Sequence, residues 1–297
     1  MSYRVGIDGG GTKTECILLN EAGEIIARHL APGCNPSVVG PEQAKLIVTD
    51  ALCQLVAAAG SSPSIAHTHI YAAGNRTFWK ETGAALTGFG KVFTADDSWP
   101  VLELATLGRP GIVLHGGTGS FVAARAPDGS VHYAGGIGWR FGDPGSGYDL
   151  GRRAISRALL ELQGWAPASR LGPTVRDHTQ LGESADAAGV TRFFYYHAEP
   201  NRQIAGLAPA ILRLAEEGDH TAHQLVLESL DDLLGLANRV ATKLFPGVAL
   251  DSLPAGLSGP ILTHPISRTA MSTRSPLPLA PVEGSPIDGV RRLVLRA

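Results

Sequence analysis

Hydrophobic and polar residues alternate in the N-terminal part of the chain. Residues 3–7, 15–20 and 24–29 each place apolar side chains on one face of an extended segment, and turns rich in glycine separate the three runs. This pattern predicts a three-stranded meander.

The spacing of the apolar residues then becomes helical. Residues 41–60 begin with Pro41 at a first helical position and end at Gly60, and between them apolar residues recur with the period of a helix. Further along, the pattern predicts short strands and helices in turn, at 69–72, 77–88, 91–95 and 99–107. The order of these elements indicates a mixed α/β fold.

A weak internal repeat connects the first third of the chain to the middle. With an offset of 106 residues, Gly10, Gly11, Thr12 and Gly23 fall on Gly116, Gly117, Thr118 and Gly129. In both places an apolar strand enters a Gly-Gly-Thr turn and is followed by a strand, a hairpin turn and a third strand. We interpret the repeat as a duplicated meander, in which Leu114 corresponds to Asp8 and His115 lies beside it.

The C-terminal half has a different pattern. Residues 151–163 and 203–244 have helical spacing and are predicted to build the second domain. The segment from Asp251 is rich in proline and serine, which predicts irregular structure with short strands. The last residues, 288–297, are predicted to form a helix that returns to the first domain.

Composition narrows the class of protein. The 297 residues include 25 Lys and Arg, 27 Asp and Glu, and 44% hydrophobic residues, which favours a soluble protein of two domains. A net charge of −2 gives no reason to expect nucleic acid or an anionic membrane as a partner. No signal peptide or membrane span is evident, and Cys16, Cys34 and Cys53 form no C-x-x-C pair. We therefore expect a cytoplasmic protein without a structural metal.

Two turns have the composition of phosphate-binding loops. Residues 8–14, Asp-Gly-Gly-Gly-Thr-Lys-Thr, follow a strand, so backbone N–H groups, two threonine hydroxyls and Lys13 can meet an anion, while Asp8 can hold Mg²⁺ through water. The spacing matches neither a P-loop nor a dinucleotide fingerprint. Residues 116–120 form the second such turn, and if the halves face one another, both turns can hold one nucleotide. A plain hairpin is the alternative for each.

Two further segments are candidates for chemistry. Asp96 and Asp97 follow a strand at its C-terminal end, where open α/β sheets place ligands, although a carboxylate there often caps a helix instead. Residues 135–147 are dense in glycine ahead of a helix, which is typical of a close ligand approach or of a simple connector.

Together these residues resemble a known family. The sequences VGIDGGGTKT, GGTGS and GGIGWRFGDPGSGYDLG are similar to those of the BadF/BadG/BcrA/BcrD ATPase family, and within it to the N-acetylglucosamine and glucosamine kinases. The resemblance implies an α/β protein of two ribonuclease H-like (actin-like ATPase) domains with a central cleft. Residues 1–108 with 286–297 would form the first domain and 109–285 the second.

The resemblance also implies roles for individual residues. Asp97, which lies 21 residues before Thr118, matches the catalytic carboxylate, and it is preferred to Asp96. The sugar would be held by Asn35, Asp97, Gly136 and Asp143, and Mg²⁺ by Asp8 through water. ATP would be bound by Gly10, Gly11, Thr12, Lys13, Thr14, Thr118, Gly119, Ser120 and Gly259.

The resemblance implies an ATP-dependent and Mg²⁺-dependent amino-sugar kinase, acting on N-acetylglucosamine to give its 6-phosphate, and a homodimer. Ile137 and Pro144 stand where the family has Trp and Glu, so a glucosamine or muramic-acid sugar remains an alternative acceptor. A nucleotide-binding sensor or ATPase subunit without sugar transfer is the alternative from another class. The radical-enzyme activators of the family are disfavoured, because the three cysteines do not lie in a cluster-binding loop.

Overall fold

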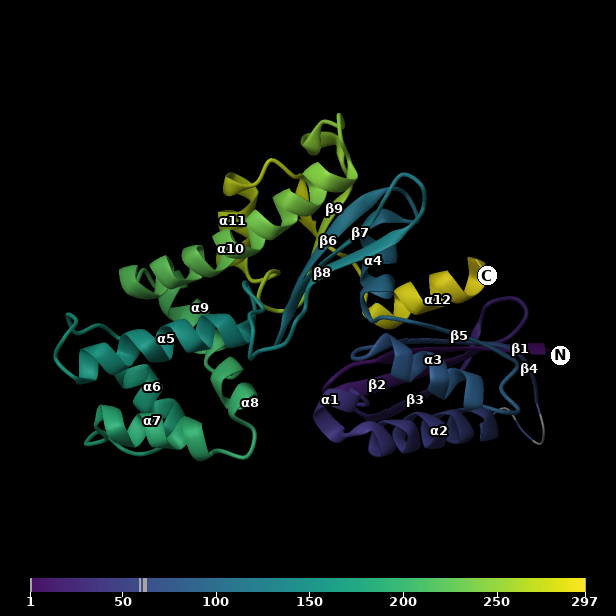
Figure 1. Ribbon diagram of the computed structural model, residues 1–297, viewed down its shortest axis with the longest axis horizontal. Helices are drawn as coiled ribbons and strands as arrows, with labels where there is room; N and C mark the ends of the chain where they lie inside the picture. The colour runs from purple at the N-terminus through teal and green to yellow at the C-terminus, as the bar shows by residue number, and fades with distance from the viewer. Residues whose placement is uncertain (1, 59, 61–62, 297) are drawn as a thin grey trace. The chain divides into compact units, whose positions relative to one another are not determined.

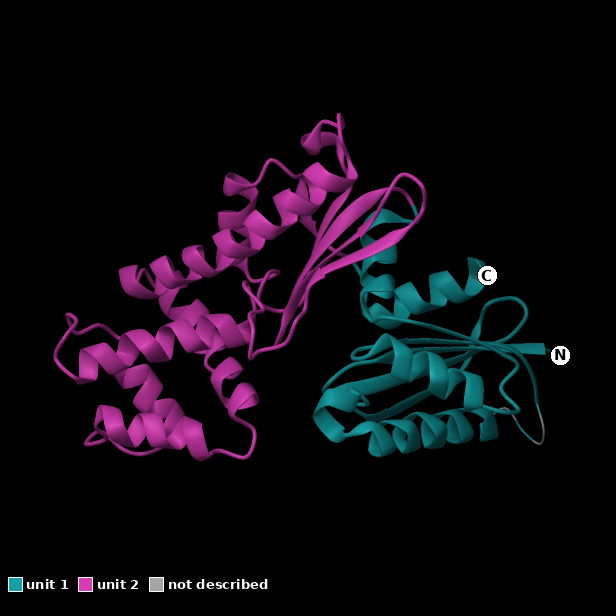
Figure 2. Ribbon diagram, viewed as in Figure 1, with its two compact units in different colours: residues 1–108, 283–297 teal, residues 109–282 magenta. Residues whose placement is uncertain are grey.

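The computed structural model describes residues 2–58, 60 and 63–296. The chain divides into two compact units, residues 1–108 with 283–297 (unit 1) and residues 109–282 (unit 2), which Figure 2 distinguishes by colour. The sequence places the point where the chain returns to the first domain at residue 286. Whether the predicted domains fold independently stays a prediction.

Unit 1 is built on a five-stranded sheet in the order β3-β2-β1-β4-β5. The first three strands form the predicted meander, in which β1 and β3 are antiparallel to β2, whereas β1, β4 and β5 run parallel. The strands are β1 (Ser2–Gly9), β2 (Lys13–Leu19), β3 (Ile25–Pro32), β4 (Ser64–Ala72) and β5 (Lys91–Ala95). The helices are α1 (Pro36–Val39), α2 (Pro41–Ala57), α3 (Arg76–Ala85), α4 (Ser98–Thr106) and α12 (Pro286–Arg296).

Helices cover both faces of this sheet (Figure 1). Val5 and Ile7 project to the face covered by α2 and α3, where they join a core that includes Leu52. On the opposite face, Ile17 packs in a second core with Val290 of α12. The alternation that predicted strands therefore separates residues into two cores, because successive side chains of a strand point to opposite faces.

Unit 2 repeats this sheet in the order β10-β9-β6-β7-β8 and adds more helices. The strands are β6 (Gly111–Gly116), β7 (Ser120–Arg125), β8 (Val131–Gly135), β9 (Ala255–Ser258) and β10 (Leu279–Pro281). The helices are α5 (Gly147–Leu162), α6 (Leu171–Thr179), α7 (Ala187–Tyr196), α8 (Pro200–Ala205), α9 (Ala208–Glu216), α10 (His220–Leu244), the short 3₁₀ turn η1 (Leu250–Ser252) and α11 (Pro265–Arg274). One core joins the sheet to these helices.

The predicted second meander is present as β6, β7 and β8, but the correspondence of Asp8 with Leu114 is wrong. Gly9 pairs with Thr14 across the first hairpin, whereas Gly116 pairs with Ser120 across the second, so the second connection is one residue shorter. A single offset cannot align both strands of the two hairpins. By strand pairing, Asp8 corresponds to His115.

Helices α6, α7 and α11 were not predicted from the sequence, and neither was the four-residue helix α1. Helices α6 and α7 span only 9 and 10 residues, so each contains too few turns for the apolar period to stand out in the sequence. Helix α11 lies in the segment that the sequence predicts to be irregular. The helix can form there because Pro265 is at its start, where the missing N–H is tolerated, and so does not break it. The predicted C-terminal helix is confirmed as α12, which packs on α4 and β1 of unit 1.

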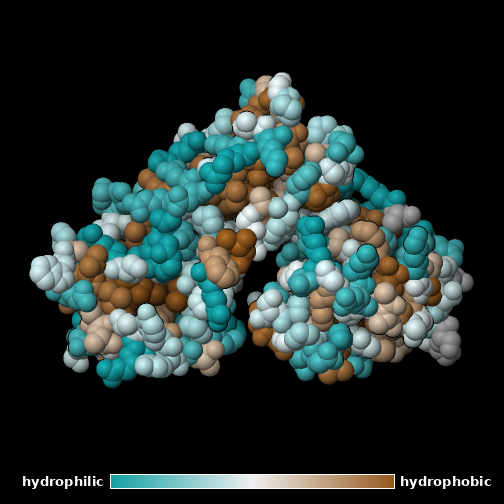
Figure 3. All heavy atoms as spheres, in the orientation of Figure 1, coloured by the Kyte–Doolittle hydropathy of each residue, from teal (hydrophilic) through white to brown (hydrophobic). Residues whose placement is uncertain are grey.

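Hydrophilic residues cover most of the face drawn in Figure 3, and apolar residues remain there in patches. The most exposed large apolar side chains include Trp165, Tyr195 and Tyr196 of unit 2. Within the described part of the chain, no helix combines the length and apolar character required to cross a membrane.

Candidate functional site

Two carboxylates lie at the same edge of the sheet in unit 1. Asp8 is near the end of β1, and Asp97 follows β5, and because these strands are parallel their carboxyl ends share one edge. Burial raises the pKa of Asp97 to about 7, with further contributions from the charges of Asp96 and Asp8. Burial likewise raises the pKa of Asp8 to about 7, although Lys13 opposes this shift. The pair is electrostatically coupled.

The neighbours Asp96 and Asp97 have different roles. Asp96 is buried, accepts a hydrogen bond from the hydroxyl of Ser98 and forms an ion pair with Arg76. Asp97 occupies the position before α4, yet its side chain makes no capping hydrogen bond with that helix. Asp96 therefore holds the local structure, and Asp97 keeps its carboxylate available. The capping alternative does not describe Asp97.

The turn between β1 and β2 is held by backbone contacts. The N–H of Gly10 donates to the carbonyl of Lys13 at 2.9 Å, and the N–H of Cys34 donates to the carbonyl of Gly10 at 3.0 Å. A Cβ on Gly33 would lie 2.3 Å from the carbonyl oxygen of Gly11, so the two segments can meet only because residue 33 is glycine. Thr12 is exposed in this turn.

The hydroxyls at the end of each turn are already engaged. Thr14 is buried and donates to the carbonyl of Pro32 at 2.8 Å, and Ser120 is buried and donates to the carbonyl of Pro144 at 2.7 Å. These two residues correspond in the repeat. Thr14 ties its hairpin to the last residue of β3, and Ser120 ties its hairpin to the glycine-dense loop after β8, so each hydroxyl already donates its proton to a backbone carbonyl.

Asn35 lies in the loop between β3 and α1, next to Cys34, whose N–H donates to the carbonyl of Gly10 in the first turn. Its Oδ1 accepts a hydrogen bond from the N–H of Ser37 at 3.0 Å and so caps the short helix α1. The amide is half-buried. Capping uses the oxygen, which leaves the two N–H donors of the side chain for a ligand hydroxyl.

In unit 2, the corresponding turn is joined to the start of α5. The N–H of Gly147 donates to the carbonyl of Gly117 at 2.8 Å, and the N–H of Tyr148 donates to that of Thr118 at 3.2 Å. The first turn of α5 therefore uses its unpaired N–H groups to fix the carbonyls of this turn. The N–H groups of Thr118 and Gly119 in this turn are left for a ligand.

The glycine-dense loop brings Asp143 to the same turn. A Cβ on Gly119 would lie 2.8 Å from Oδ2 of Asp143, and Oδ1 accepts a hydrogen bond from the N–H of Gly138 at 3.3 Å. Asp143 is buried, has a φ of 70°, and burial raises its pKa. A left-handed conformation at a non-glycine residue marks a strained position of the kind found in ligand sites. Gly136 has a φ of 58° in the same loop.

Gly259 follows β9, directly beside the end of β6. A Cβ at this position would lie 2.4 Å from the carbonyl oxygen of Gly116, and the φ of Gly259 is 85°. Only glycine fits both conditions. The structure therefore brings Thr118, Gly119, Ser120, Asp143 and Gly259 together in unit 2, and Asp8, residues 10–14, Asn35 and Asp97 together in unit 1.

Two residues of these clusters were not predicted as site residues. Cys34 is buried beside Thr14, and burial raises the pKa of its thiol to about 11. His115 is next to Gly116, with Nδ1 3.2 Å from the hydroxyl of Ser258. Its correspondence with Asp8 was the available signal, and the unequal hairpin lengths concealed it.

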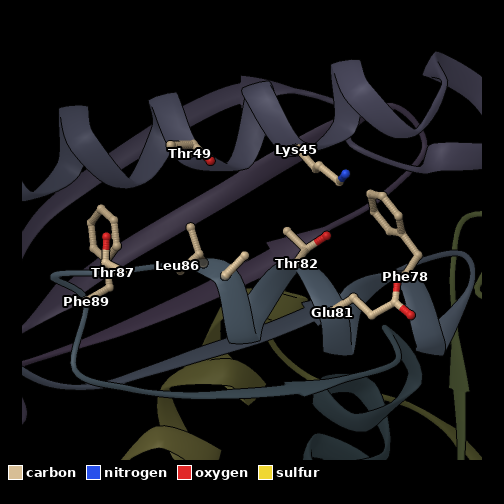
Figure 4. Close-up of a pocket in the computed structure, with 9 residues that line it drawn as sticks. Lys45, Thr49, Phe78, Glu81, Thr82, Leu86, Thr87 and Phe89 are labelled. Carbon is tan, nitrogen blue, oxygen red and sulfur yellow. The ribbon is translucent and has the colours of Figure 1, made fainter.

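The cavities detected in unit 1 lie away from most of these residues. One of about 340 Å³ opens between α2 and α3, where Lys45 and Phe78 point toward one another (Figure 4). None of the predicted site residues lines it. A second, of about 350 Å³, is lined by Pro36 and Asn75 and so lies next to the loop that carries Asn35.

Two carboxylates of unit 1, Asp8 and Asp97, are the candidates to face a cation such as Mg²⁺. Among the described residues, no cluster of three or more His, Cys, Asp or Glu side chains has the arrangement of a metal site. The chemistry of the pair Asp8 and Asp97 nevertheless fits a cation, because the pKa of each is raised by burial and a nearby positive charge would favour ionisation. This fits a cation held mainly by phosphate oxygens and water, with Asp8 in contact through water.

Two copies of a sheet with this strand order, flanked by helices, make the duplicated α/β fold of the actin-like ATPases. The chain belongs to the BadF/BadG/BcrA/BcrD ATPase family, whose family model matches residues 5–245.

Its relatives include named sugar kinases. The glucosamine kinase of Vibrio cholerae is 30% identical over 238 residues, 78% of each chain. The N-acetylmuramic acid/N-acetylglucosamine kinase of Clostridium acetobutylicum is 25% identical over 239 residues, 78% of this chain and 77% of that one. The crystal structure of a proposed N-acetylglucosamine kinase from Chromobacterium violaceum is similar with a TM-score of 0.78 and 29% identity, covering 99% of this chain and 98% of the other.

Proposed function

We propose that the protein is an ATP-dependent kinase that phosphorylates an amino sugar, with N-acetylglucosamine as the first candidate and its 6-phosphate as product. The observation that carries the proposal is the available carboxylate of Asp97, which lies beside Asp8 and the glycine-rich turn while Asp96 is engaged elsewhere. The names of the relatives support sugar phosphorylation.

In the proposed reaction, Asp97 accepts the proton of the sugar hydroxyl as its oxygen attacks the γ-phosphorus of ATP, and ADP leaves. A base with a pKa of about 7 is suited to this task near neutral pH, because it is ionised often enough and still binds the proton. Phosphoryl transfer needs little more from the protein than position and charge stabilisation.

The remaining predicted residues hold the reactants. Backbone N–H groups of residues 11–14 and 118–120 bind phosphate oxygens, while the N–H of Gly10 closes the first turn onto the carbonyl of Lys13, whose side chain adds a positive charge. Gly259 lines the nucleoside. Mg²⁺, when bound near Asp8 through water, would neutralise phosphate charge.

Asn35, Asp143 and the backbone at Gly136 hold the sugar. The amide of Asn35 is half-buried and the carboxylate of Asp143 is buried, so a sugar that leaves either group without a hydrogen bond should bind more weakly. Ile137 is exposed in the same loop, where it can meet a substituent of the sugar. The N-acetyl, free amino and lactyl groups of the candidate acceptors differ in size and charge, so this loop is where we expect the choice between them to be made.

The test is ADP release from Mg²⁺-ATP with N-acetylglucosamine, glucosamine, N-acetylmuramic acid, glucose or no sugar. Sugar-dependent release supports the proposal and identifies the acceptor, and mass spectrometry of the product locates the phosphate. Equal release without sugar, or nucleotide binding without turnover, would instead identify an ATPase subunit or a sensor. Omitting Mg²⁺ tests the metal requirement.

A homodimer and a cytoplasmic location belong to the same proposal. The exposed aromatic residues Trp165, Tyr195 and Tyr196 offer apolar surface to a second copy. Light scattering coupled to gel filtration measures the molar mass against 31.0 kDa for one chain.

A further inference from the structure

His115 stands in unit 2 where Asp8 stands in unit 1. Asp8 pairs with Glu15 of β2 and Tyr71 of β4, and His115 pairs with Phe121 of β7 and Ser258 of β9. Both residues precede the glycine-rich turn that follows their strand. Where unit 1 places an acid, unit 2 places an imidazole.

The ring of His115 contacts both glycine turns of unit 2. A Cβ on Gly117 would lie 3.1 Å from its Nε2, and a Cβ on Gly259 would lie 3.0 Å from its Cε1. The ring also stacks on Phe121, with centroids 4.8 Å apart and planes at 13°. Phe121 in turn stacks on Tyr133. The imidazole is therefore held between an aromatic stack and the two glycine turns.

The direction of one hydrogen bond decides which nitrogen of His115 carries the proton, because the hydroxyl of Ser258 can donate to Nδ1 or accept from it. Nδ1 of His115 lies 3.2 Å from Oγ of Ser258. Burial lowers the pKa of His115 to about 4, so the ring is neutral at pH 7 and carries one proton. When the hydroxyl of Ser258 donates to Nδ1, that proton is on Nε2, the nitrogen nearest Gly117.

The Nε2 nitrogen of His115 can be reached by a ligand. Among the described residues, the only hydrogen bond of the ring is the one with Ser258, and Nε2 is not fully buried. A neutral donor beside a turn of backbone N–H groups can bind a phosphate oxygen without adding a charge that titrates near neutral pH.

We propose that His115 donates a hydrogen bond from Nε2 to a phosphate oxygen of the nucleotide bound at the turn 117–119, and that Ser258 fixes the required tautomer. The inference rests on the proposed function only in assuming that this turn binds a nucleoside phosphate. It does not depend on the identity of the sugar or on transfer to it.

Two substitutions at one position separate this role from simple packing. His115→Gln keeps an amide N–H near the place of Nε2, whereas His115→Asn is shorter, retains only a group near Nδ1 and loses the donor. Ser258→Ala removes the hydroxyl that orients the ring. His132→Asn, at an exposed histidine of β8 in the same sheet, is the matched control.

Calorimetry with ADP and with adenosine measures the effect directly. We expect His115→Asn to weaken ADP binding about tenfold or more and to leave adenosine binding within about threefold, because only ADP carries the phosphate. His115→Gln should bind ADP within about threefold of the parent protein, and His132→Asn should behave as the parent. Equal losses for ADP and adenosine, or unchanged ADP binding in His115→Asn, would overturn the proposal.

Nitrogen NMR of the ¹⁵N-histidine protein gives a readout on the parent protein that does not depend on folding of the His115 variants. The expected spectrum shows a neutral ring with the proton on Nε2, whose signal shifts when ADP is added, and a mixed tautomer in Ser258→Ala. A proton on Nδ1 in the ADP complex would overturn the proposal. If the protein binds ADP as described but phosphorylates no sugar, the proposed function fails and this inference stands.

Discussion

The hairpin turns of the two units are built alike but carry different chemistry. In each, a buried hydroxyl donates to a proline carbonyl, from Thr14 to the end of the third strand in unit 1 and from Ser120 to the loop after the third strand in unit 2. Unit 1 then adds the acids Asp8 and Asp97, whereas unit 2 adds His115 and Gly259. A duplicated scaffold has kept the backbone contacts that shape the turn and changed the side chains around it.

Under the proposed function, the glycine-rich turns of both units bind the nucleotide, and the proposed base, Asp97, lies in unit 1 alone. Substitutions at the side chains that differ test this difference in chemistry, and substitutions at the shared hydroxyls test the common structure.

The largest effect is expected at Asp97. Asp97→Asn removes the proposed base and should lower kcat by about 10²–10⁴ while ADP binding stays nearly unchanged. Initial rates of ADP release and calorimetry measure the two quantities. Asp50→Asn, at an exposed position of α2, is the control. Turnover within tenfold of the parent would remove Asp97 from the reaction and undo the contrast between the units.

Gly259 tests whether unit 2 acts through its backbone. Gly259→Ala should destabilise the protein by about 2–5 kcal/mol and weaken ADP binding, because its Cβ would meet the carbonyl of Gly116. Gly129→Ala is the matched control, since both glycines have a φ of 85° but Gly129 faces open space. It should lose only about 1–2 kcal/mol. Chemical denaturation compares them, and equal losses would show that close approach at Gly259 is unimportant.

The pKa of Asp97 predicts how activity depends on pH. Since the base must be ionised, kcat/KM should fall about tenfold per pH unit below a pKa of about 7. The stability effect has the opposite direction: a carboxyl whose pKa is raised by folding favours the folded state at low pH, and this contribution is lost as pH rises through about 7. Rate profiles and thermal unfolding between pH 5 and 8 measure both, and a flat kcat/KM would contradict the assignment.

The smallest effects are expected at the shared hydroxyls. Thr14→Val and Ser120→Ala should each cost about 1–3 kcal/mol of unfolding free energy, because each leaves a proline carbonyl without its donor. Similar losses would support a duplicated structural contact. If kcat fell 100-fold with stability unchanged, the hydroxyl in question would instead contact substrate.

The sequence predicted those parts of the fold that depend on local periodicity. The meander, α2 and β5 follow from apolar spacing, and the second meander follows from the repeat. The position of His115 did not, because one residue fewer in a hairpin shifts one strand against the other. Helix α11 was missed because the prolines of this segment predict irregular structure, although Pro265 is at the start of the helix, where proline is tolerated.

The candidate site was predictable where residue type determines chemistry, as at Asp97 and the glycine turns. The sequence could not show which of these polar side chains are already engaged by partners elsewhere in the fold. Asp96 and Asp97 are the same residue type, and the contacts of Asp96 with Arg76 of α3 and with Ser98 show which of the two is engaged. The hydroxyls of Thr14 and Ser120 donate to proline carbonyls 18 and 24 residues away in the sequence, which only the folded chain brings close.

The return of α12 to unit 1 has a consequence for biosynthesis. Val290 packs so closely on the first strand that a Cβ on Gly6 would lie 2.5 Å from it. Because α12 follows the whole of unit 2 in the chain, part of this face of the unit 1 sheet stays uncovered until α12 has been translated, although Trp99 of α4 packs there earlier. During synthesis, unit 2 therefore has all of its elements before unit 1 does, and Ile17 and Tyr71 lie on the apolar face that is partly exposed in the interval.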